Sequence, residues 1–421
     1  MKSYIKIISS IFCIGIIFMS CTDKEPSIDD NFLNYQIQDV TLTESCQVGA
    51  YYYNNGSTGL NTNAYTRLTD IQDLAAGKAG PNVQPTLDNY GTANTIASVQ
   101  VMQQHVDWAI AGGIDFFVMP GLTEDVNKIY PNNITADNTR FVNLVTGRIG
   151  SDGLDSLLTT GSRVNMKGLK YALSVNPANT TSNPTPVLDN NNLIEYSKLH
   201  PMTGLSKVQR FNELFKRISD YFSDPHYYKI NGKPVVVILN PQLIYAEDAA
   251  KLYDDMRAYL KAYCGQDIYL IAQQVSWTPP ARYEYFQIRG KVDALTYTCM
   301  YNQPMADRSY WYPQLIDQNW MYSRNYLMTN WNIDFVPNVS PSFTYYVNTG
   351  ANYDIPIINK DPKVFRTFCN VAKKNLGRNR VVLIESFNQW AYNTALEPTK
   401  PEYGNGYGTS YLDVVKEQFK K

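Results

Sequence analysis

The chain has 421 residues, of which 44% are hydrophobic and 18% are charged, with a formal net charge of −1 at pH 7. Its length allows a large buried core, and its balanced charge offers no basic surface for nucleic acid. With 3 His in the whole chain and no CxxC pair, the chain offers few side chains for a metal site or a histidine-based catalytic triad. We therefore expect no metal and no cofactor.

The N-terminus predicts a lipoprotein signal peptide. Lys2 and Lys6 are followed by an apolar run at residues 7–19, which is too short to span a membrane. The run ends in Phe18-Met19-Ser20-Cys21, which resembles a bacterial lipobox. We expect residues 1–21 to be this signal and Cys21 to carry the lipid anchor.

The rest of the chain divides into a tether and one domain. Residues 22–44 begin with a polar, acidic stretch that predicts a flexible tether, and residues 45–421 form the domain. Its four cysteines are far apart in the sequence, so we expect buried thiols and deduce no disulfide; they are Cys46, Cys264, Cys299 and Cys369. We expect a cell-envelope protein held at the outer membrane by its lipid alone.

Predicted strands and helices alternate along the domain. Strands are expected at 46–53, 114–119, 169–175, 234–239, 268–272, 292–298, 334–339 and from 381 onward. Helices are expected at 99–110, 211–222 and 246–263, and after Asp361 as N-cap, with Pro362 in the first turn and Gly377 at the exit. Eight such strands favour a (β/α)8 barrel, although a doubly wound sheet also alternates.

Three long inserts are expected at residues 54–94, 122–166 and 302–331. Each follows a predicted strand, so we expect long loops on the C-terminal face, where such barrels build their sites.

The stretch Val381–Trp390 is predicted to be one strand with a buried start and a polar end at the barrel mouth. A period of two would place Glu385, Phe387 and Gln389 on one face. Glu385 would then be a carboxyl inside the barrel, with a pKa raised by burial, and is the candidate catalytic residue. The alternative is that Glu385 lies about 13 Å below Gln389, at 3.3 Å per residue, and pairs with a buried Lys, Arg or Tyr.

Other strand ends carry uncharged hydrogen-bonding groups, which suit a sugar better than acid–base chemistry. The first strand runs into three tyrosines and an asparagine, and tyrosine supplies a flat ring with a polar tip. The candidate ligand-binding residues at strand ends are Tyr51, Tyr53, Asn54, Asn176, Asn240, Gln274, Tyr297 and Asn338.

Four stretches, in order along the domain, carry a family resemblance. They are Pro85–Tyr90, His105–Phe117, Asp224-Pro225-His226-Tyr227-Tyr228-Lys229-Ile230-Asn231-Gly232-Lys233-Pro234, and the ending Phe387–Pro398 with Tyr407–Leu412. They resemble the glycoside hydrolase family 99-like proteins, which include the WbsX-like group. The resemblance implies a (β/α)8 barrel and an oligosaccharide or polysaccharide partner.

The same resemblance places two carboxylates in the last motif of endo-mannosidase-type members. One assists the 2-hydroxyl of the sugar as nucleophile, and the other protonates the leaving oxygen. Here these positions are Gln389 and Tyr392. Gln389 neither gives nor takes a proton, and Tyr392 keeps its proton to a pKa near 10. We therefore predict a hydrolase-like barrel that binds carbohydrate through Asn388, Gln389, Trp390 and Tyr392 among others.

Two alternatives stay open at this point. The chain could be an active endo-acting glycoside hydrolase that uses Glu385 or a loop carboxylate, Glu124 or Asp125. It could also be a structural or partner-binding lipoprotein whose long loops plug the barrel mouth. Trp390 could stack on a sugar or be a buried ring at the rim, and Glu397 matches a family position but more often would be a structural anchor.

Overall fold

The computed structural model describes residues 33–53, 83–87, 96–123, 136–137, 143, 145–146, 163–177, 193–194, 206–275, 277–280, 291–344, 358, 360–390 and 392–421. The chain separates into two units, residues 1–36 and 37–421, and the second contains every helix and strand among the described residues. Cys21, Asn54, Glu124 and Asp125 lie outside the described residues. Within the described parts, no helix has both the length and the apolar character needed to cross a membrane.

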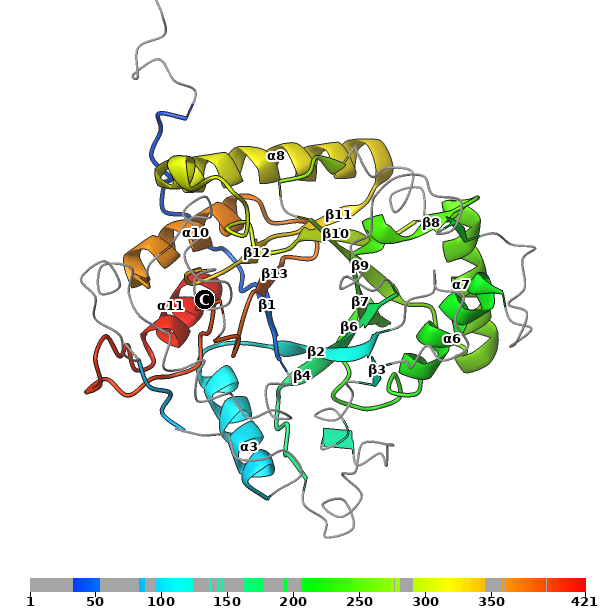
Figure 1. The fold of residues 1–421 in the computed structure, drawn as a ribbon, viewed down its shortest axis with the longest axis horizontal. Coiled ribbons are helices and arrows are strands. Elements are labelled where there is room, and N and C mark those ends of the chain that lie inside the picture. Colours follow the sequence, from blue (N-terminus) through cyan, green and yellow to red (C-terminus); the bar gives the residue numbers. More distant parts are fainter. Residues whose placement is uncertain are drawn as a thin grey trace, which may run out of the picture. The chain divides into compact units, whose positions relative to one another are not determined.

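Parallel strands form a barrel in the predicted order (Figure 1). They are β1 (Gln47–Tyr51), β2 (Phe116–Thr123), β4 (Lys170–Asn176), β7 (Lys233–Leu239), β9 (Tyr269–Gln274), β10 (Ala294–Tyr297), β11 (Asp334–Val336), β12 (Asn338–Val339) and β13 (Val381–Ile384). β1 pairs with both β2 and β13. The predicted (β/α)8 barrel is confirmed.

The nine strands occupy eight positions because Pro337 divides one of them. β11 pairs with β10, and β12 pairs with β13. Proline has no N–H to donate to a ladder, but its carbonyl still accepts from the backbone N–H of Leu383. The predicted strand at 334–339 is therefore one strand position with a break, and it joins the two ends of the sheet.

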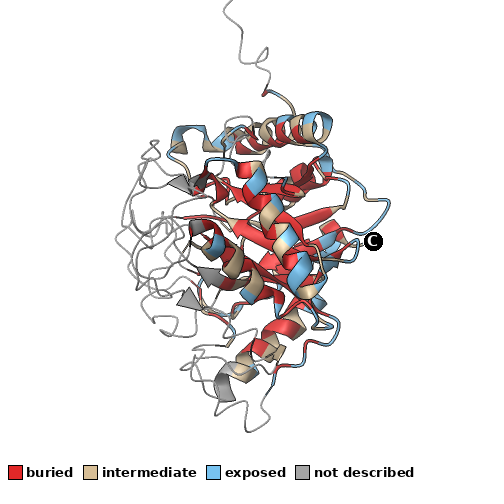
Figure 2. Cartoon of the chain, turned by 90° about the vertical axis from the view of Figure 1, so that its right-hand side faces the viewer, coloured by how far each residue is buried: buried red, intermediate tan, exposed pale blue. Residues whose placement is uncertain are grey.

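Two apolar layers fill the space on either side of the strands. Val235 and Val237 of β7 belong to the cluster inside the barrel, whereas Val236 and Ile238 belong to the cluster between strands and helices. Figure 2 shows these strands buried, with exposed surface on the outer sides of the helices. Because both faces are covered, successive residues are apolar without alternation.

The helices lie between strands in sequence, as expected, except for the last helix, which follows the final strand. They are α3 (Ile96–Ala111), α6 (Lys207–Ser219), α7 (Ala249–Cys264), α8 (Tyr312–Trp331), α10 (Pro362–Lys374) and α11 (Ser410–Phe419). Asp361 caps α10 through the backbone N–H of Lys363, as predicted. Short elements complete the described fold: β3 (Ala136–Asp137), β5 (Leu193–Ile194), β6 (Lys229–Ile230), β8 (Tyr245–Ala246), η2 (Pro241–Leu243) and η5 (Ala306–Trp311).

The expectation of a long loop at 302–331 is wrong. Most of this range is α8, which buries Ile316, Trp320 and Leu327 at helical spacing. The helix was missed because its sequence is rich in Tyr, Trp and Asn, which have middling helix propensity, so packing rather than propensity stabilises it.

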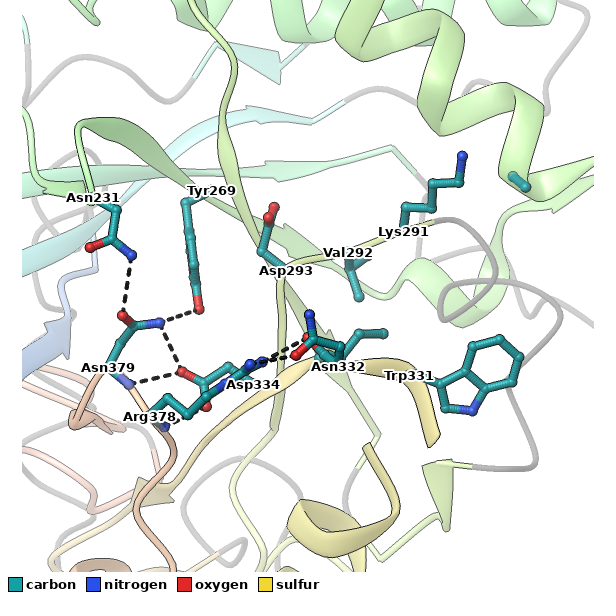
Figure 3. Close-up of a pocket in the computed structure, with 12 residues that line it drawn as sticks. Asn231, Tyr269, Lys291, Val292, Asp293, Trp331, Asn332, Asp334, Arg378 and Asn379 are labelled. Carbon is teal, nitrogen blue, oxygen red and sulfur yellow. Dashed lines mark hydrogen bonds between the residues drawn. The ribbon is translucent and has the colours of Figure 1, made fainter. Parts of the chain in front are cut away.

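The N-terminal end of the barrel contains a cavity of about 760 Å³, drawn in Figure 3. Asp334 begins β11, and its carboxylate accepts hydrogen bonds from the backbone N–H groups of Phe335, Arg378 and Asn379. The Asn379 side chain also donates to Asp334 and to the Tyr269 hydroxyl (Figure 3). This end of a barrel usually serves stability rather than chemistry, and here the carboxylate already has several partners.

Gly377 lies against this network and offers a test of it. A Cβ at this position would come within 2.1 Å of Asp334 Oδ1 and 2.2 Å of the Phe335 carbonyl oxygen. We expect Gly377→Ala to lower the free energy of unfolding by about 1–3 kcal/mol, as overpacking does, measured by urea denaturation. Gly168→Ala is the control, because a Cβ there meets nothing within 4 Å. Equal stability of the two variants would contradict the close packing of Gly377 against Asp334 and Phe335.

Candidate functional site at the barrel mouth

A cavity of about 210 Å³ lies at the C-terminal ends of the strands. It is the end at which (β/α)8 barrels carry their sites. The polar residues that line it are Tyr51, Tyr52, Tyr53, Ser174, Asn176, Gln273 and Glu385. Glu385 is the one carboxyl among the described residues that line this cavity.

Glu385 follows directly after β13 and is held by three neighbours. Asn338 Nδ2 donates to Glu385 Oε2 at 3.0 Å, and the Tyr53 side chain and the Cys299 backbone N–H also hydrogen-bond to the carboxyl. Burial raises the pKa of Glu385 above its ordinary value of 4.5, and these hydrogen bonds partly oppose the rise. The protonated form is therefore favoured more than in water.

The tyrosines of the mouth act as neutral hydrogen-bonding groups. Gln273 Nε2 donates to the Tyr51 hydroxyl at 2.9 Å. Burial, and then the charge of Glu385, raise the pKa values of Tyr51 and Tyr53 well above 10. Neither hydroxyl serves as a base near neutral pH, but both suit hydrogen bonds to an uncharged ligand.

Asn388 positions Tyr53. The Asn388 side chain accepts from the Tyr53 backbone N–H at 2.8 Å and donates to the Tyr53 carbonyl oxygen at 3.1 Å. Asn388 itself is buried. Its amide groups thus fix the backbone at the end of the first strand.

The predicted continuation of the last strand to Trp390 is wrong, because β13 ends at Ile384. After that point Phe387 packs outside the barrel, with its ring centroid 5.0 Å from that of Phe117. Glu385 and Phe387 therefore do not share a face. Glu385 lines the mouth cavity instead of lying deep in the barrel, and the Tyr53 side chain hydrogen-bonds to it there.

Trp390 and Glu397 belong to a buried network beside the mouth. The indole N–H of Trp390 donates to Glu397 Oε2 at 2.9 Å, and Glu397 Oε1 lies 3.2 Å from His105 Nε2. The Tyr52 hydroxyl lies 2.9 Å from His105 Nδ1. Burial lowers the pKa of His105 to about 3, so the ring is neutral. The network makes Trp390 and Glu397 structural supports rather than ligand contacts.

Gln274 and Tyr297 point away from the cavity. Gln274 Nε2 donates to the Thr278 carbonyl oxygen at 3.0 Å, and the Tyr297 hydroxyl lies 2.7 Å from Ser323 Oγ of α8. The residue before Gln274 is the one that lines the mouth. Sequence reasoning missed Gln273 and Ser174, because strands that are buried on both faces show no alternation to separate inward from outward positions.

Of the remaining candidates, Asn176 is in the lining of the mouth cavity, whereas Asn240, Gln389 and Tyr392 are not. Asn240 has a left-handed backbone with φ 52° and precedes η2. The Gln389 backbone N–H donates to Ser386 Oγ at 2.8 Å, and the Tyr392 ring stacks on Phe343, with centroids 6.1 Å apart. Among the described residues, no group of His, Cys, Asp or Glu could hold a metal ion.

Solved structures of glycoside hydrolase-like proteins have the same barrel architecture. A structure titled "Glycoside hydrolase-like protein" is 27% identical, with a TM-score of 0.67, covering 93% of this chain and 99% of that chain. The GH99 endo-alpha-mannosidase from Bacteroides thetaiotaomicron shares the fold at 14% identity and a TM-score of 0.52, covering 89% of this chain and 97% of that chain. No curated protein matches.

The family described as "Glycosyltransferase WbsX" matches residues 205–415. This range is half of the chain and runs from the start of α6 to α11. The chain belongs to the WbsX family.

The raised pKa of Glu385 predicts how stability depends on pH. Below the ordinary pKa of 4.5, the carboxyl is protonated in both the folded and the unfolded chain, so it has no pH-dependent effect on stability. Above this pKa, the carboxyl ionises in the unfolded chain first, which stabilises the unfolded chain relative to the fold. Glu385 therefore destabilises the fold increasingly as pH rises through its folded pKa. We expect Glu385→Gln to gain stability relative to the natural protein over this window, measured by urea denaturation between about pH 4 and 8.

Glu402→Gln, which removes an exposed carboxyl, is the matched control for the loss of one negative charge. If Glu385→Gln instead loses stability relative to the natural protein as pH rises, the fold favours the ionised carboxylate, and the raised pKa of Glu385 is wrong.

Proposed function

We propose that this chain is a lipid-anchored carbohydrate-binding protein of the cell envelope, with a hydrolase-like barrel in which Gln389 and Tyr392 replace the usual carboxylate pair. It binds an oligosaccharide or polysaccharide at the barrel mouth and serves polysaccharide utilisation at the outer membrane. The names of its relatives support the ligand class, because a glycosyltransferase family, a glycoside hydrolase-like protein and an endo-alpha-mannosidase all concern sugars.

The observation that carries the proposal is the chemistry of the mouth cavity. Its described lining contains tyrosine hydroxyls, amides and a serine, with Glu385 as a single carboxyl. Cleavage of a glycosidic bond commonly needs two carboxyl groups, one to give a proton and one to act as nucleophile or base. The described lining therefore keeps hydrogen-bonding groups that suit a sugar, and among the described residues it offers Glu385 no second carboxyl for the reaction.

The size of the cavity supports a short stretch of glycan. Its volume of about 210 Å³ is below the roughly 300–1,000 Å³ of pockets for drug-sized ligands. The described lining therefore suits one sugar ring rather than several.

The second candidate is an active endo-acting glycoside hydrolase. The raised pKa of Glu385 favours it, because a general acid must carry a proton near the working pH. Its partner would be a loop carboxylate such as Glu124 or Asp125, at about 5–10 Å across the cleft.

A glycan screen of the chain without residues 1–21 tests the proposal, read for binding and for release of reducing ends. We expect binding without release. Asn176→Ala removes a hydrogen-bonding side chain from the mouth and should weaken binding about 3–10-fold by calorimetry. Asn405→Ala, an exposed asparagine, is the control and should bind normally.

Release at enzyme-like rates that disappears in Glu385→Gln would establish the second candidate instead. Absence of any glycan binding would contradict both the binding protein and the hydrolase. If glycan binds without release, Gln389→Glu with Tyr392→Glu restores the family's carboxylates and tests whether their loss alone accounts for the missing hydrolysis.

The lipid anchor has its own test. In cells that process lipoproteins, the natural chain should incorporate labelled palmitate and sediment with outer membranes. Cys21→Ser should lose the label and leave the membrane fraction, because the lipid is the proposed attachment. Cys13→Ser, also within the predicted signal, is the matched control. Membrane attachment of Cys21→Ser would disprove the anchor.

A further inference from the structure

The solvent-facing side of α8 is unusually aromatic for an exposed helix. The opposite side of the helix buries Tyr312, Ile316, Trp320, Ser323 and Leu327 against the barrel. Of the four large hydrophobic residues that are exposed among the described residues, Tyr322 lies on α8, at 48% exposure, and Tyr310 lies in η5 just before it, at 67%. Figure 1 shows α8 as the long helix along one side of the barrel.

The aromatic rings form one line along the helix. At about 100° per residue, Gln318, Tyr322 and Tyr326 lie within roughly 80° of one another around the axis of α8, and Trp311 ends η5 directly before the helix. We call these four residues, with Tyr310, the tyrosine stripe. Tyr322 and Tyr326 stack with centroids 5.9 Å apart and an interplanar angle of 24°, and Tyr310 contacts Trp311 at 4.7 Å.

The stripe itself contains no charged residue. The two charged residues of α8 have partners elsewhere: Asp317 is buried and accepts from Lys374 and Asn375, and Arg324 donates to the Lys374 carbonyl oxygen. η5 also carries the exposed Asp307 and Arg308, which form an ion pair with each other at 3.7 Å. Their opposite charges cancel, so the surface gives no net attraction to nucleic acid, anionic lipid or an acidic peptide. Flat rings with hydroxyl tips, separated by an amide, suit the apolar faces and hydroxyl groups of a neutral sugar chain.

The stripe starts on the same side of the barrel as the mouth. β10 leads to Cys299, whose backbone N–H bonds to Glu385, and the chain then forms η5 and α8. The helix runs from there to the N-terminal end, where Trp331 lines the other cavity. Trp311 and Tyr326 are separated by about 22 Å along the axis, so the surface is long enough for a chain rather than for one ring.

We propose that the tyrosine stripe is a second glycan-binding site, which holds a neutral polysaccharide chain along the outside of the barrel. It shares with the proposed function the premise that the ligand is a glycan. The mouth binds a short segment, and the stripe adds contacts that only a long chain reaches. Two weak sites on one chain then give an affinity for polysaccharide that exceeds the affinity for oligosaccharide.

The test is affinity electrophoresis of the full chain in gels that contain mannan, glucan or galactan, together with calorimetry on the matching di- to tetrasaccharides. The variant is Tyr322→Ala with Tyr326→Ala. We expect its affinity for the retarding polysaccharide to fall about tenfold, because two stacking rings are lost. Binding of short oligosaccharides should stay unchanged. Tyr263→Ala is the matched control, since Tyr263 of α7 is a 51% exposed tyrosine outside the stripe.

The outcomes separate this inference from the proposed function. Unchanged retardation of the double variant, or an equal loss in Tyr263→Ala, overturns the stripe and leaves the mouth standing. Loss of retardation in a chain that binds no oligosaccharide supports the stripe and rejects the mouth. A chain that no polysaccharide retards overturns the inference. The inference is also overturned if light scattering shows that the natural chain is a dimer and the double variant a monomer, because the stripe is then a protein interface. Thermal unfolding checks that each variant is folded.

Discussion

Closure of the barrel is the constraint on which the site depends. β1 pairs with β2 on one side and with β13 on the other, so the first and last strands become neighbours. Their C-terminal ends then place Tyr53 beside Asn388, although the two residues are 335 positions apart in the sequence. Without this pairing, neither the tyrosines nor Glu385 would share a cavity.

The environment of Glu385 illustrates how a barrel sets the character of its mouth. Burial alone would hold the carboxyl protonated, and the hydrogen bonds from Asn338, Cys299 and Tyr53 favour its ionised form. The burial effect is the larger of the two. The surrounding hydroxyls and amides remain uncharged, so the cavity as a whole favours polar, uncharged ligands.

The two ends of the same barrel differ in the use of their polar groups. At the N-terminal end, the carboxylate of Asp334 is saturated by backbone and side-chain donors from the loop after α10, which fixes the strands. At the mouth, polar groups border an accessible cavity. The larger cavity at the N-terminal end is therefore the less suitable one for a ligand, because the Asp334 carboxylate and the Asn379 amide in its lining already have partners within the protein.

The sequence by itself determined the order of strands and helices, the barrel class and the N-cap of α10. Apolar runs, Asp361 and Pro362 were sufficient for these predictions, since each depends on residues close together in the chain. It did not reveal α8, whose stability comes from packing. It also placed Gln274 rather than Gln273 at the mouth. Only the tertiary structure decided which residues of a strand face inward, because strands covered on both faces carry no periodic signal. The partners of Glu385 and the burial of Trp390 likewise depend on contacts between distant segments, which form when the barrel closes.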